Sequence, residues 1–284
     1  MNPFQWDACP LCGGGDVHEI GPITYRQPIR FSTREIALAH TPMLFECRGC
    51  DSWFTQRIVP QATAFLLYET GASSEKWADT PAFVEGKSRN IVDRLSQHIK
   101  AGKKVLDVGA NTGELLDHVR SLGAETSGAE PSRASREVLT RKGHQTFARL
   151  EDVSGTFDVI TAFDLVEHLY DIPVFLRRAH QLLAPDGVLI LLTGDRHCLS
   201  AEKSRQNWWY LKAPEHIVFP SDKYFRKVPG FQLLTKDATY ASAGYERSRI
   251  MQWFQFIRKI LLKGGYDGLP SLGPDHMLLS LKKD

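Results

Sequence analysis

Two short stretches of the sequence combine acidic residues with glycines in a way that suits a small ligand. Val105-Leu-Asp-Val-Gly-Ala-Asn-Thr-Gly-Glu114 passes through Asp107 into a turn bracketed by Gly109 and Gly113, and such a turn brings backbone N–H groups close to a ligand. In Ser127-Gly-Ala-Glu-Pro-Ser132, Glu130 stands twenty-three residues beyond Asp107, where a carboxylate can accept both hydroxyls of a ribose. Together the two stretches indicate a site for a ribose-containing ligand.

The glycine turn differs from the one that binds dinucleotides. That fingerprint is G-x-G-x-x-G, whose second glycine makes room for a pyrophosphate. Here the turn reads G-x-N-x-G, with Asn111 in place of a middle glycine, and Asn adopts left-handed conformations more readily than most residues. Asp107 beside the turn favours a ligand with an ammonium or sulfonium group over one with phosphates.

Four of the five cysteines fall into two pairs with metal-ligand spacing. Cys9-Pro-Leu-Cys12 and Cys47-Arg-Gly-Cys50 each place two thiolates on one knuckle, and two knuckles supply the four sulfurs of a closed structural zinc site. Free buried thiols or a redox pair are the alternatives. We expect the thiol of Cys198, the fifth cysteine, to be inert.

Two histidines are candidates for a base that works near neutral pH. His168 directly follows Glu167, and His216 lies in Pro214-Glu-His-Ile-Val-Phe-Pro220. Each of them has a hydrogen-bonded structural role as its alternative. Glu167 or His168 is also placed to orient an acceptor, or to hold a divalent ion that acidifies it.

Aromatic residues gather at two places late in the chain. Gln206-Asn-Trp-Trp-Tyr-Leu211 puts three adjacent aromatics in a polar stretch, where they either stack on a flat or sugar-like acceptor or anchor the stretch to the core. Trp253, Phe254 and Phe256 are typical of a core or an interface rather than of a ligand site.

Composition and charge favour a compact protein with a full core. The 284 residues are 42% hydrophobic and 24% charged, which allows two domains and argues against disorder. The net charge of +2 demands neither nucleic acid nor an anionic membrane as a partner. Residues 1–60 carry five arginines against six acidic residues, a net charge of −1, whereas phosphate binding would favour a basic patch.

No segment indicates a membrane or a secretory route. Val188-Leu-Ile-Leu-Leu192, among the longest apolar runs, is far shorter than the roughly eighteen residues of a membrane span. The first seven residues lack a basic stretch followed by an apolar one. We therefore expect a cytoplasmic protein with no membrane partner; its oligomeric state is not indicated.

After an irregular first segment, short apolar runs alternate with amphipathic ones. Strands are predicted at 104–108, 126–130, 144–147, 157–163, 188–193, 231–234 and 277–282, and helices at 81–102, 114–122, 132–142, 171–184 and about 245–262. This alternation predicts a doubly wound α/β fold with a mainly parallel sheet, whose ligands lie at the carboxyl ends of the strands. We divide the chain into a module at 1–60, a connector at 61–79 and a catalytic domain at 80–284 with a lid insertion at 194–228.

At these motifs the sequence resembles the class I S-adenosylmethionine-dependent methyltransferases. Val105–Gly113 is similar to their first motif, and Gly128-Ala-Glu-Pro131 to their acidic second motif. Phe157-Asp-Val-Ile160 with Asp164-Leu-Val-Glu-His-Leu169 is similar to the fourth-strand motif of the small-molecule branch, and Leu183-Ala-Pro-Asp-Gly187 to the turn before the fifth strand. The resemblance covers residues 80–284 and implies a seven-stranded Rossmann-like sheet.

The resemblance also implies roles for individual residues. Asp107 would order the ammonium group of the methionine part, Glu130 would bind the ribose, and residues after the third strand would frame the adenine. The cofactor-binding set is Asp107, Gly109, Ala110, Asn111, Gly113, Glu130, Pro131, Arg149, Leu150 and Phe163. Which carboxylate meets the adenine amine stays open, because Glu151 and Asp152 are equally well explained as a solvated helix cap.

The cysteine pairs resemble the zinc ribbon that precedes the catalytic domain in a group of bacterial methyltransferases acting on metabolites and sugars. The zinc ligands would be Cys9, Cys12, Cys47 and Cys50. We therefore expect methyl transfer from S-adenosylmethionine to the oxygen or carbon of a small metabolite or activated sugar, with His216, His168 and Glu167 as catalytic candidates. The alternatives are an rRNA or tRNA methyltransferase that uses the zinc module for recognition, and a non-catalytic nucleotide-binding module.

Overall fold

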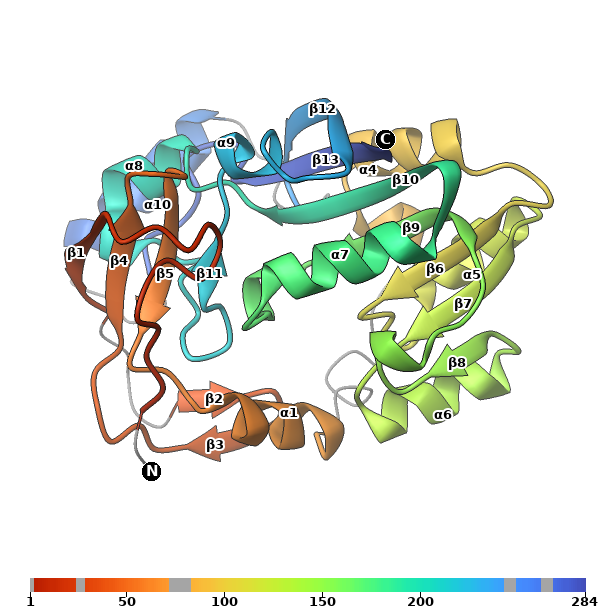
Figure 1. Cartoon of the computed structure of the whole chain (residues 1–284). Coiled ribbons are helices and arrows are strands. Elements are labelled where there is room, and N and C mark those ends of the chain that lie inside the picture. Colours follow the sequence, from red (N-terminus) through yellow and green to blue (C-terminus); the bar gives the residue numbers. More distant parts are fainter. Residues whose placement is uncertain (1–2, 24–28, 72–82, 243–248, 262–267) are drawn as a thin grey trace.

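The computed structural model describes residues 3–23, 29–71, 83–242, 249–261 and 268–284. Its main sheet has seven strands in the order β12-β13-β10-β9-β6-β7-β8 (Figure 1). Neighbouring strands from β8 to β10 are parallel, and β13 is antiparallel to both β10 and β12. The strands are β6 Lys104–Val108, β7 Glu125–Ala129, β8 Gln145–Phe147, β9 Phe157–Phe163, β10 Leu183–Gly194, β12 Phe231–Thr239 and β13 His276–Lys283. The predicted doubly wound, mainly parallel sheet is confirmed.

Helices cover both faces of this sheet, so its central strands are apolar at successive positions. On one face Leu106, Leu189 and Leu279 pack with α7, and on the other Val105, Ile190 and Leu278 pack with α4 and α5. The helices of this domain are α3 Phe83–Gly86, α4 Arg89–His98, α5 Glu114–Ser121, α6 Arg133–Arg141, α7 Ile172–Leu182, α8 Leu199–Ser204, α9 Asp222–Phe225 and α10 Arg249–Leu261. Among the described residues, no helix has the length and apolar character to cross a membrane.

Strands 104–108 and 157–163 match the prediction residue for residue, and others differ at their ends. The helix predicted over 81–102 is two helices in the described residues, because Ser88 takes an extended conformation between α3 and α4. Strand β10 begins at Leu183, earlier than predicted, but its register shifts between Leu183 and Val188, where the turn was expected. The predicted helix at about 245–262 contains α10, and its two ends lie outside the described residues.

The first segment, expected to be irregular, contains a regular antiparallel sheet at the left of Figure 1. Its order is β1-β4-β5-β11, and its fourth strand comes from the far end of the lid insertion. The hairpin of β2 and β3 and the helix α1 lie below this sheet in Figure 1. The bounds are β1 Val17–Pro22, β2 Ile29–Phe31, β3 Arg34–Ile36, β4 Met43–Cys47, β5 Ser52–Gln56, α1 Gln61–Glu69 and β11 Val218–Phe219. Part of the predicted connector is therefore helical, and its residues 72–79 lie outside the described residues.

The turn after β6 holds its shape through glycine geometry. Gly113 has a φ of +89°, and a Cβ there would lie 2.6 Å from Leu139 Cδ2 on α6. Gly155 has a similar φ of +92° but no atom within 4 Å of a Cβ. The two positions therefore separate backbone strain from steric overlap.

We predict that Gly113→Ala destabilises the protein more than Gly155→Ala. Both variants carry the cost of a left-handed Ala, about 1 kcal/mol, and Gly113→Ala adds overpacking worth about 1–3 kcal/mol. Urea unfolding of the two variants and the parent measures the difference. Equal losses of unfolding free energy would contradict the packing argument.

Candidate active site

The ligand loop connects β6 to α5 at the carboxyl edge of the sheet. Gly109, Asn111 and Gly113 all have positive φ, at +80°, +46° and +89°, so Asn111 takes the left-handed conformation expected of it. Its backbone N–H donates to Glu130 Oε2 at 2.9 Å, and its side-chain oxygen accepts from Ser135 Oγ at 3.1 Å. The loop is thereby tied to the end of β7 and the start of α6.

Glu130 is buried and fixed from two sides. Its Oε1 accepts from the Ser132 N–H at 2.8 Å while Oε2 accepts from Asn111. Burial raises the pKa of this carboxyl above its usual value. Each carboxylate oxygen accepts only one hydrogen bond within the described residues, so a lone pair on each suits the paired hydroxyls of a ribose.

Asp107 lies inside the end of β6, with its side chain 5% exposed. Thr161 Oγ1 on the neighbouring strand donates to its Oδ1 at 2.7 Å. Burial raises the pKa of Asp107 to about 7, against the opposing effect of that hydrogen bond. A ligand that brings an ammonium group stabilises the ionised form of such a buried carboxyl.

The expected adenine side is more open. Arg149 is exposed, and its guanidinium lies 4.6 Å over the ring of Phe65 on α1. Leu150 packs against the core from a short 3₁₀ helix at Leu150–Asp152, whose two acidic residues, Glu151 and Asp152, are exposed. Three further residues were predicted to contact the cofactor. Ala110 is buried, and the Pro131 carbonyl accepts a hydrogen bond from Arg136. Phe163 stacks on Phe83 with ring centroids 6.3 Å apart.

The three catalytic candidates come together beside this loop. Glu167 and His168 belong to a 3₁₀ helix, Val166–His168, just after β9, and His216 precedes β11. Each offers one ligand atom, and the three atoms lie within 4.8 Å of one another. The His168 and His216 rings meet edge to face with centroids 4.7 Å apart.

Both histidines contact backbone oxygens through Nδ1. His216 Nδ1 lies 2.7 Å from the Tyr210 carbonyl, and His168 Nδ1 lies 2.9 Å from the Glu215 carbonyl. Because a carbonyl only accepts, each Nδ1 carries a hydrogen. Burial, followed by the neighbouring His168, holds the pKa of His216 well below its usual range, so this ring is neutral at pH 7.

Glu167 is fully buried and fixed by two hydroxyl groups. Tyr210 donates to its Oε1, and Thr193 Oγ1 donates to its Oε2 at 2.9 Å. Burial raises the pKa of this carboxyl. Trp208 and Tyr210 are buried as well. For these two aromatic residues the structure therefore supports the second alternative, in which they anchor the stretch to the core.

Hydrogen bonds on both sides fix the chain around His216. The Ile217 N–H donates to the Glu167 carbonyl at 2.7 Å, and the Ile217 carbonyl accepts from the Thr55 N–H at 2.8 Å. Directly after it, β11 pairs with β5, with Val218 opposite Phe54. The N-terminal sheet thus forms one wall of the acceptor side.

A second polar group at this edge escaped sequence reasoning. His276, at the start of β13, donates from Nδ1 to the buried Asp275 at 2.7 Å, and its Nε2 lies 3.7 Å from Asp164 Oδ1. Burial would lower the pKa of His276, but Asp275 and Asp164 raise it above its usual value. Despite burial, Lys87 and His276 lower the pKa of Asp164. An Asp-His dipeptide far along the chain gives no signal unless strand β13 is known to begin at this edge of the sheet.

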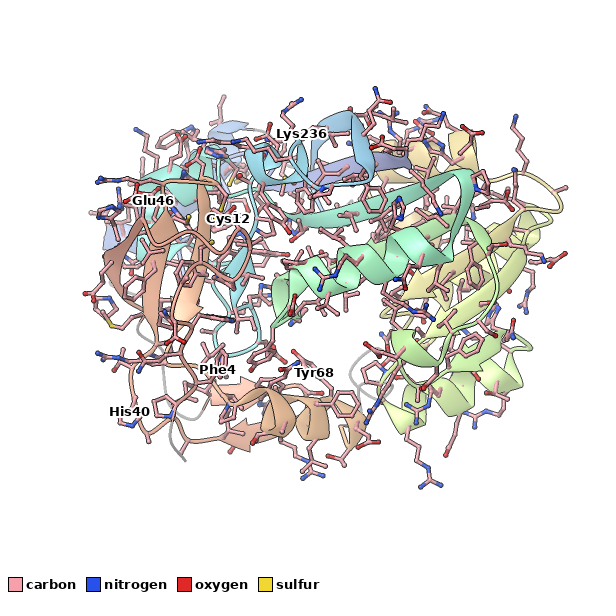
Figure 2. All side chains as sticks on the ribbon, in the orientation of Figure 1. Phe4, Cys12, His40, Glu46, Tyr68 and Lys236 are labelled. Atoms are coloured by element: carbon pink, nitrogen blue, oxygen red, sulfur yellow. The ribbon has the colours of Figure 1, made fainter. Side chains whose placement is uncertain are left out.

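Tyr68 on α1 is a further residue that the sequence did not indicate. Its hydroxyl lies 2.9 Å from His168 Nδ1, and burial holds its pKa well above the usual range. It extends from a helix that was assigned to the connector, and Figure 2 labels it on that helix. The acceptor side therefore draws residues from α1 as well as from the lid.

The four paired cysteines cluster at one end of the N-terminal sheet, where Figure 2 labels Cys12. The Sγ atoms of Cys9 and Cys50 lie 3.6 Å apart, as do those of Cys12 and Cys47. Four sulfurs at about 2.3 Å from a central zinc stand about 3.8 Å apart at tetrahedral angles. The donor set and its spacing therefore fit a structural zinc ion.

A seven-stranded sheet of this order, with a glycine loop after its first strand and an acid after its second, defines a class I S-adenosylmethionine-dependent methyltransferase. The chain belongs to the methyltransferase domain family, which it matches over residues 82–228. The family match and the strand order together identify a class I S-adenosylmethionine-dependent methyltransferase domain.

Curated relatives match a central part of the chain. Ubiquinone biosynthesis O-methyltransferases from Bradyrhizobium diazoefficiens and Nitrobacter winogradskyi are each 32% identical, over 105 and 128 residues. These matches cover 34% and 40% of this chain, and 42% and 48% of the relatives. The chain thus spans less than half of the length of either relative.

Solved structures share the fold at low sequence identity. The magnesium protoporphyrin IX methyltransferase of Synechocystis PCC 6803 with bound S-adenosylmethionine has a TM-score of 0.51 at 13% identity, covering 80% of this chain and 98% of that one. A complex of the Haloferax volcanii Trm112 methyltransferase activator with a methyltransferase gives a TM-score of 0.56 at 12% identity, covering 77% and 97%. Both likenesses concern the fold alone.

We predict that affinity for S-adenosylmethionine falls as pH drops below 7. The ligand ammonium pairs with ionised Asp107, and a pKa raised to about 7 means that the carboxyl takes up a proton just below neutrality. The loss approaches tenfold per pH unit once Asp107 is mostly protonated. Calorimetry between pH 7.5 and 5.5 measures it.

Asp107→Asn serves as the matched control, because the amide keeps the shape and does not titrate. It should bind more weakly at pH 7.5 and show a flatter pH dependence than the parent. A parent affinity that is constant from pH 7.5 to 5.5 would rule out this role for Asp107.

Proposed function

We propose that this enzyme methylates a hydroxyl group of a small metabolite or activated sugar, with His216 as the general base; an acidic carbon is the alternative acceptor. The observation that carries the proposal is the convergence of Glu167, His168 and His216 just after β9, the strand that pairs with β6. The two curated relatives are O-methyltransferases, which favours oxygen over carbon as the acceptor atom.

The protonation states support His216 in this role. A neutral ring whose Nδ1 donates to the Tyr210 carbonyl presents Nε2 as a proton acceptor. S-adenosylmethionine supplies the methyl group. The acceptor oxygen would bond to the methyl carbon as the carbon–sulfur bond breaks, and its proton would pass to His216 Nε2.

Glu167 and His168 would orient the acceptor. Glu167 is held by Tyr210 and Thr193, and His168 by the Glu215 carbonyl, so both side chains are rigid before the acceptor arrives. These two residues with His216 also have the donor types and spacing of a divalent-ion site. Such an ion would acidify the acceptor hydroxyl in place of a base, and chelation separates the two possibilities.

A small acceptor is favoured over RNA because the groups that would meet it are buried. His216 and Glu167 are both buried, and Tyr68 covers His168. The N-terminal segment, with its net charge of −1, presents no excess of positive charge for phosphates.

We also propose that Cys9, Cys12, Cys47 and Cys50 hold one structural zinc ion that fixes the acceptor side. The carbonyl of Cys50 accepts from Ser221 Oγ at 2.6 Å, and Ser52 Oγ accepts from the Ser221 N–H at 3.0 Å. These contacts tie the second knuckle to the residue that ends the His216 segment. Zinc would therefore support His216 through β11 without touching the acceptor.

For the base, we predict that His216→Asn lowers turnover by about 10²–10⁴ and leaves S-adenosylmethionine affinity nearly unchanged. The Asn amide nitrogen takes the place of Nδ1 and keeps the hydrogen bond to the Tyr210 carbonyl, but nothing replaces Nε2. Turnover at saturating cofactor and acceptor, with calorimetry for binding, measures both quantities. The exposed His40→Gln serves as the control and should behave like the parent.

In the parent, turnover at saturating cofactor should stay constant well below pH 6.5, because the pKa of His216 is lowered and the ring remains neutral there. Full activity of His216→Asn would reject His216 as the base. Activity that disappears on chelation and returns with a divalent ion would assign the acidifying role to a metal.

For the zinc site, we predict one zinc per chain, lost in Cys12→Ser and retained in Cys198→Ser. Cys198 caps α8 by accepting from the Ala201 N–H through its sulfur, and Ser caps helices well, so this control should fold. Because zinc binding energy is folding energy, the Cys12 variant should melt earlier and transfer methyl groups more slowly. Metal analysis that finds no zinc in the purified parent would refute the site.

A further inference from the structure

Helix α10 turns its most apolar face to solvent. Seven large apolar residues of this helix have exposed fractions between 42% and 84%. Met251 stands apart from the other six, which are Ile250, Trp253, Phe254, Ile257, Ile260 and Leu261. At 100° per residue they fall on one continuous side of the helix. A stable soluble helix normally buries such a side.

The opposite side of α10 is anchored to the protein. Phe256 and Gln252 are buried, and Gln252 Nε2 donates to the Tyr240 hydroxyl at 2.8 Å. Phe256 also meets Trp253 edge to face, with ring centroids 5.9 Å apart. The apolar side therefore faces outward because the helix is held by its other side. A simple rotation that buries the apolar side would break the Gln252–Tyr240 hydrogen bond and expose Phe256.

The charge around this face has one sign. Residues 249–263 contain Arg249, Arg258, Lys259 and Lys263 and no acidic residue. Arg258 is exposed and lies one turn from Phe254. An apolar helix side that includes a Trp, on a segment whose only charged residues are cations, has the composition of helices that lie in the surface of an anionic membrane.

We propose that α10 docks this enzyme onto an anionic lipid bilayer, lying parallel to the surface with the six residues of its apolar side in the headgroup region. The charge favours lipid over a second copy of the chain, because two such faces in contact would bring the two Arg258 side chains together, and residues 249–263 offer no acidic side chain to pair them. Sequence reasoning expected no membrane partner because it searched for a span. A surface helix needs none, and the absence of a spanning helix among the described residues agrees with this mode.

The test is co-sedimentation of the full chain with vesicles. Wild-type protein should sediment with vesicles of phosphatidylcholine and phosphatidylglycerol, less with phosphatidylcholine alone, and less again as salt is raised. Phe254→Glu combined with Ile257→Glu should reduce binding at least tenfold, and Arg258→Glu should weaken only the binding to the anionic vesicles.

The matched control replaces two exposed apolar residues elsewhere, Val174→Glu with Leu234→Glu, and should bind like wild type. S-adenosylmethionine affinity measured without lipid should be unchanged in every variant, which verifies folding independently of the acceptor. Absence of wild-type binding to anionic vesicles, or binding that the α10 double variant retains, would overturn the proposal. A lipid-free dimer that the double variant abolishes would instead assign the face to a second copy.

Discussion

The pairing of β11 with β5 is the contact on which the acceptor side of this methyltransferase depends. It is two residues long, yet it joins the N-terminal sheet to the segment that carries His216. Ile217 hydrogen-bonds to Thr55 on one side and to Glu167 on the other. This single residue therefore links the cysteine-bearing sheet to the segment after β9 and to the adjacent candidate base. Because a displacement of about 1 Å at a reacting group can cost about a hundredfold in rate, small changes in the N-terminal sheet can act on the chemistry without touching the acceptor.

Burial sets different charges on groups that stand close together at this edge. His276 lowers the pKa of Asp164, and Asp164 raises the pKa of His276. Each residue therefore favours the charged form of the other, with Asp164 as the anion and His276 as the cation. His216 Nδ1 hydrogen-bonds to the Tyr210 carbonyl, and burial, followed by the neighbouring His168, keeps this ring neutral. The same residue type therefore carries a different charge at the two positions, because the surroundings of the two rings differ.

The sequence predicted the parts of this molecule that local patterns encode. A few neighbouring residues are enough to indicate the glycine loop, the acid after β7 and the apolar strands. The reason is that a turn, a strand tip and a buried strand each have local requirements. The N-terminal sheet was missed because its strands are short and one of them, Val218–Phe219, is supplied from 162 residues beyond Gln56. His276 and Tyr68 reach the site through strand order and helix placement, which no spacing rule conveys. The aromatic residues of α10 were read as core or interface, and only the structure separates the buried Phe256 from the exposed Phe254.

Strand β13 follows β12 in the chain but lies between β12 and β10 in the sheet. Within the described residues β12 pairs with β13 alone, so it cannot join the sheet until the later strand has been synthesised and inserted. During translation the parallel strands up to β10 can assemble first, leaving the apolar edge of β10 open in the meantime. A nascent chain at that stage is most exposed to wrong pairing with another chain. The same late insertion brings His276 to its place beside Asp164. The polar groups at this end of the sheet are therefore complete only once β13 covers the open edge of β10.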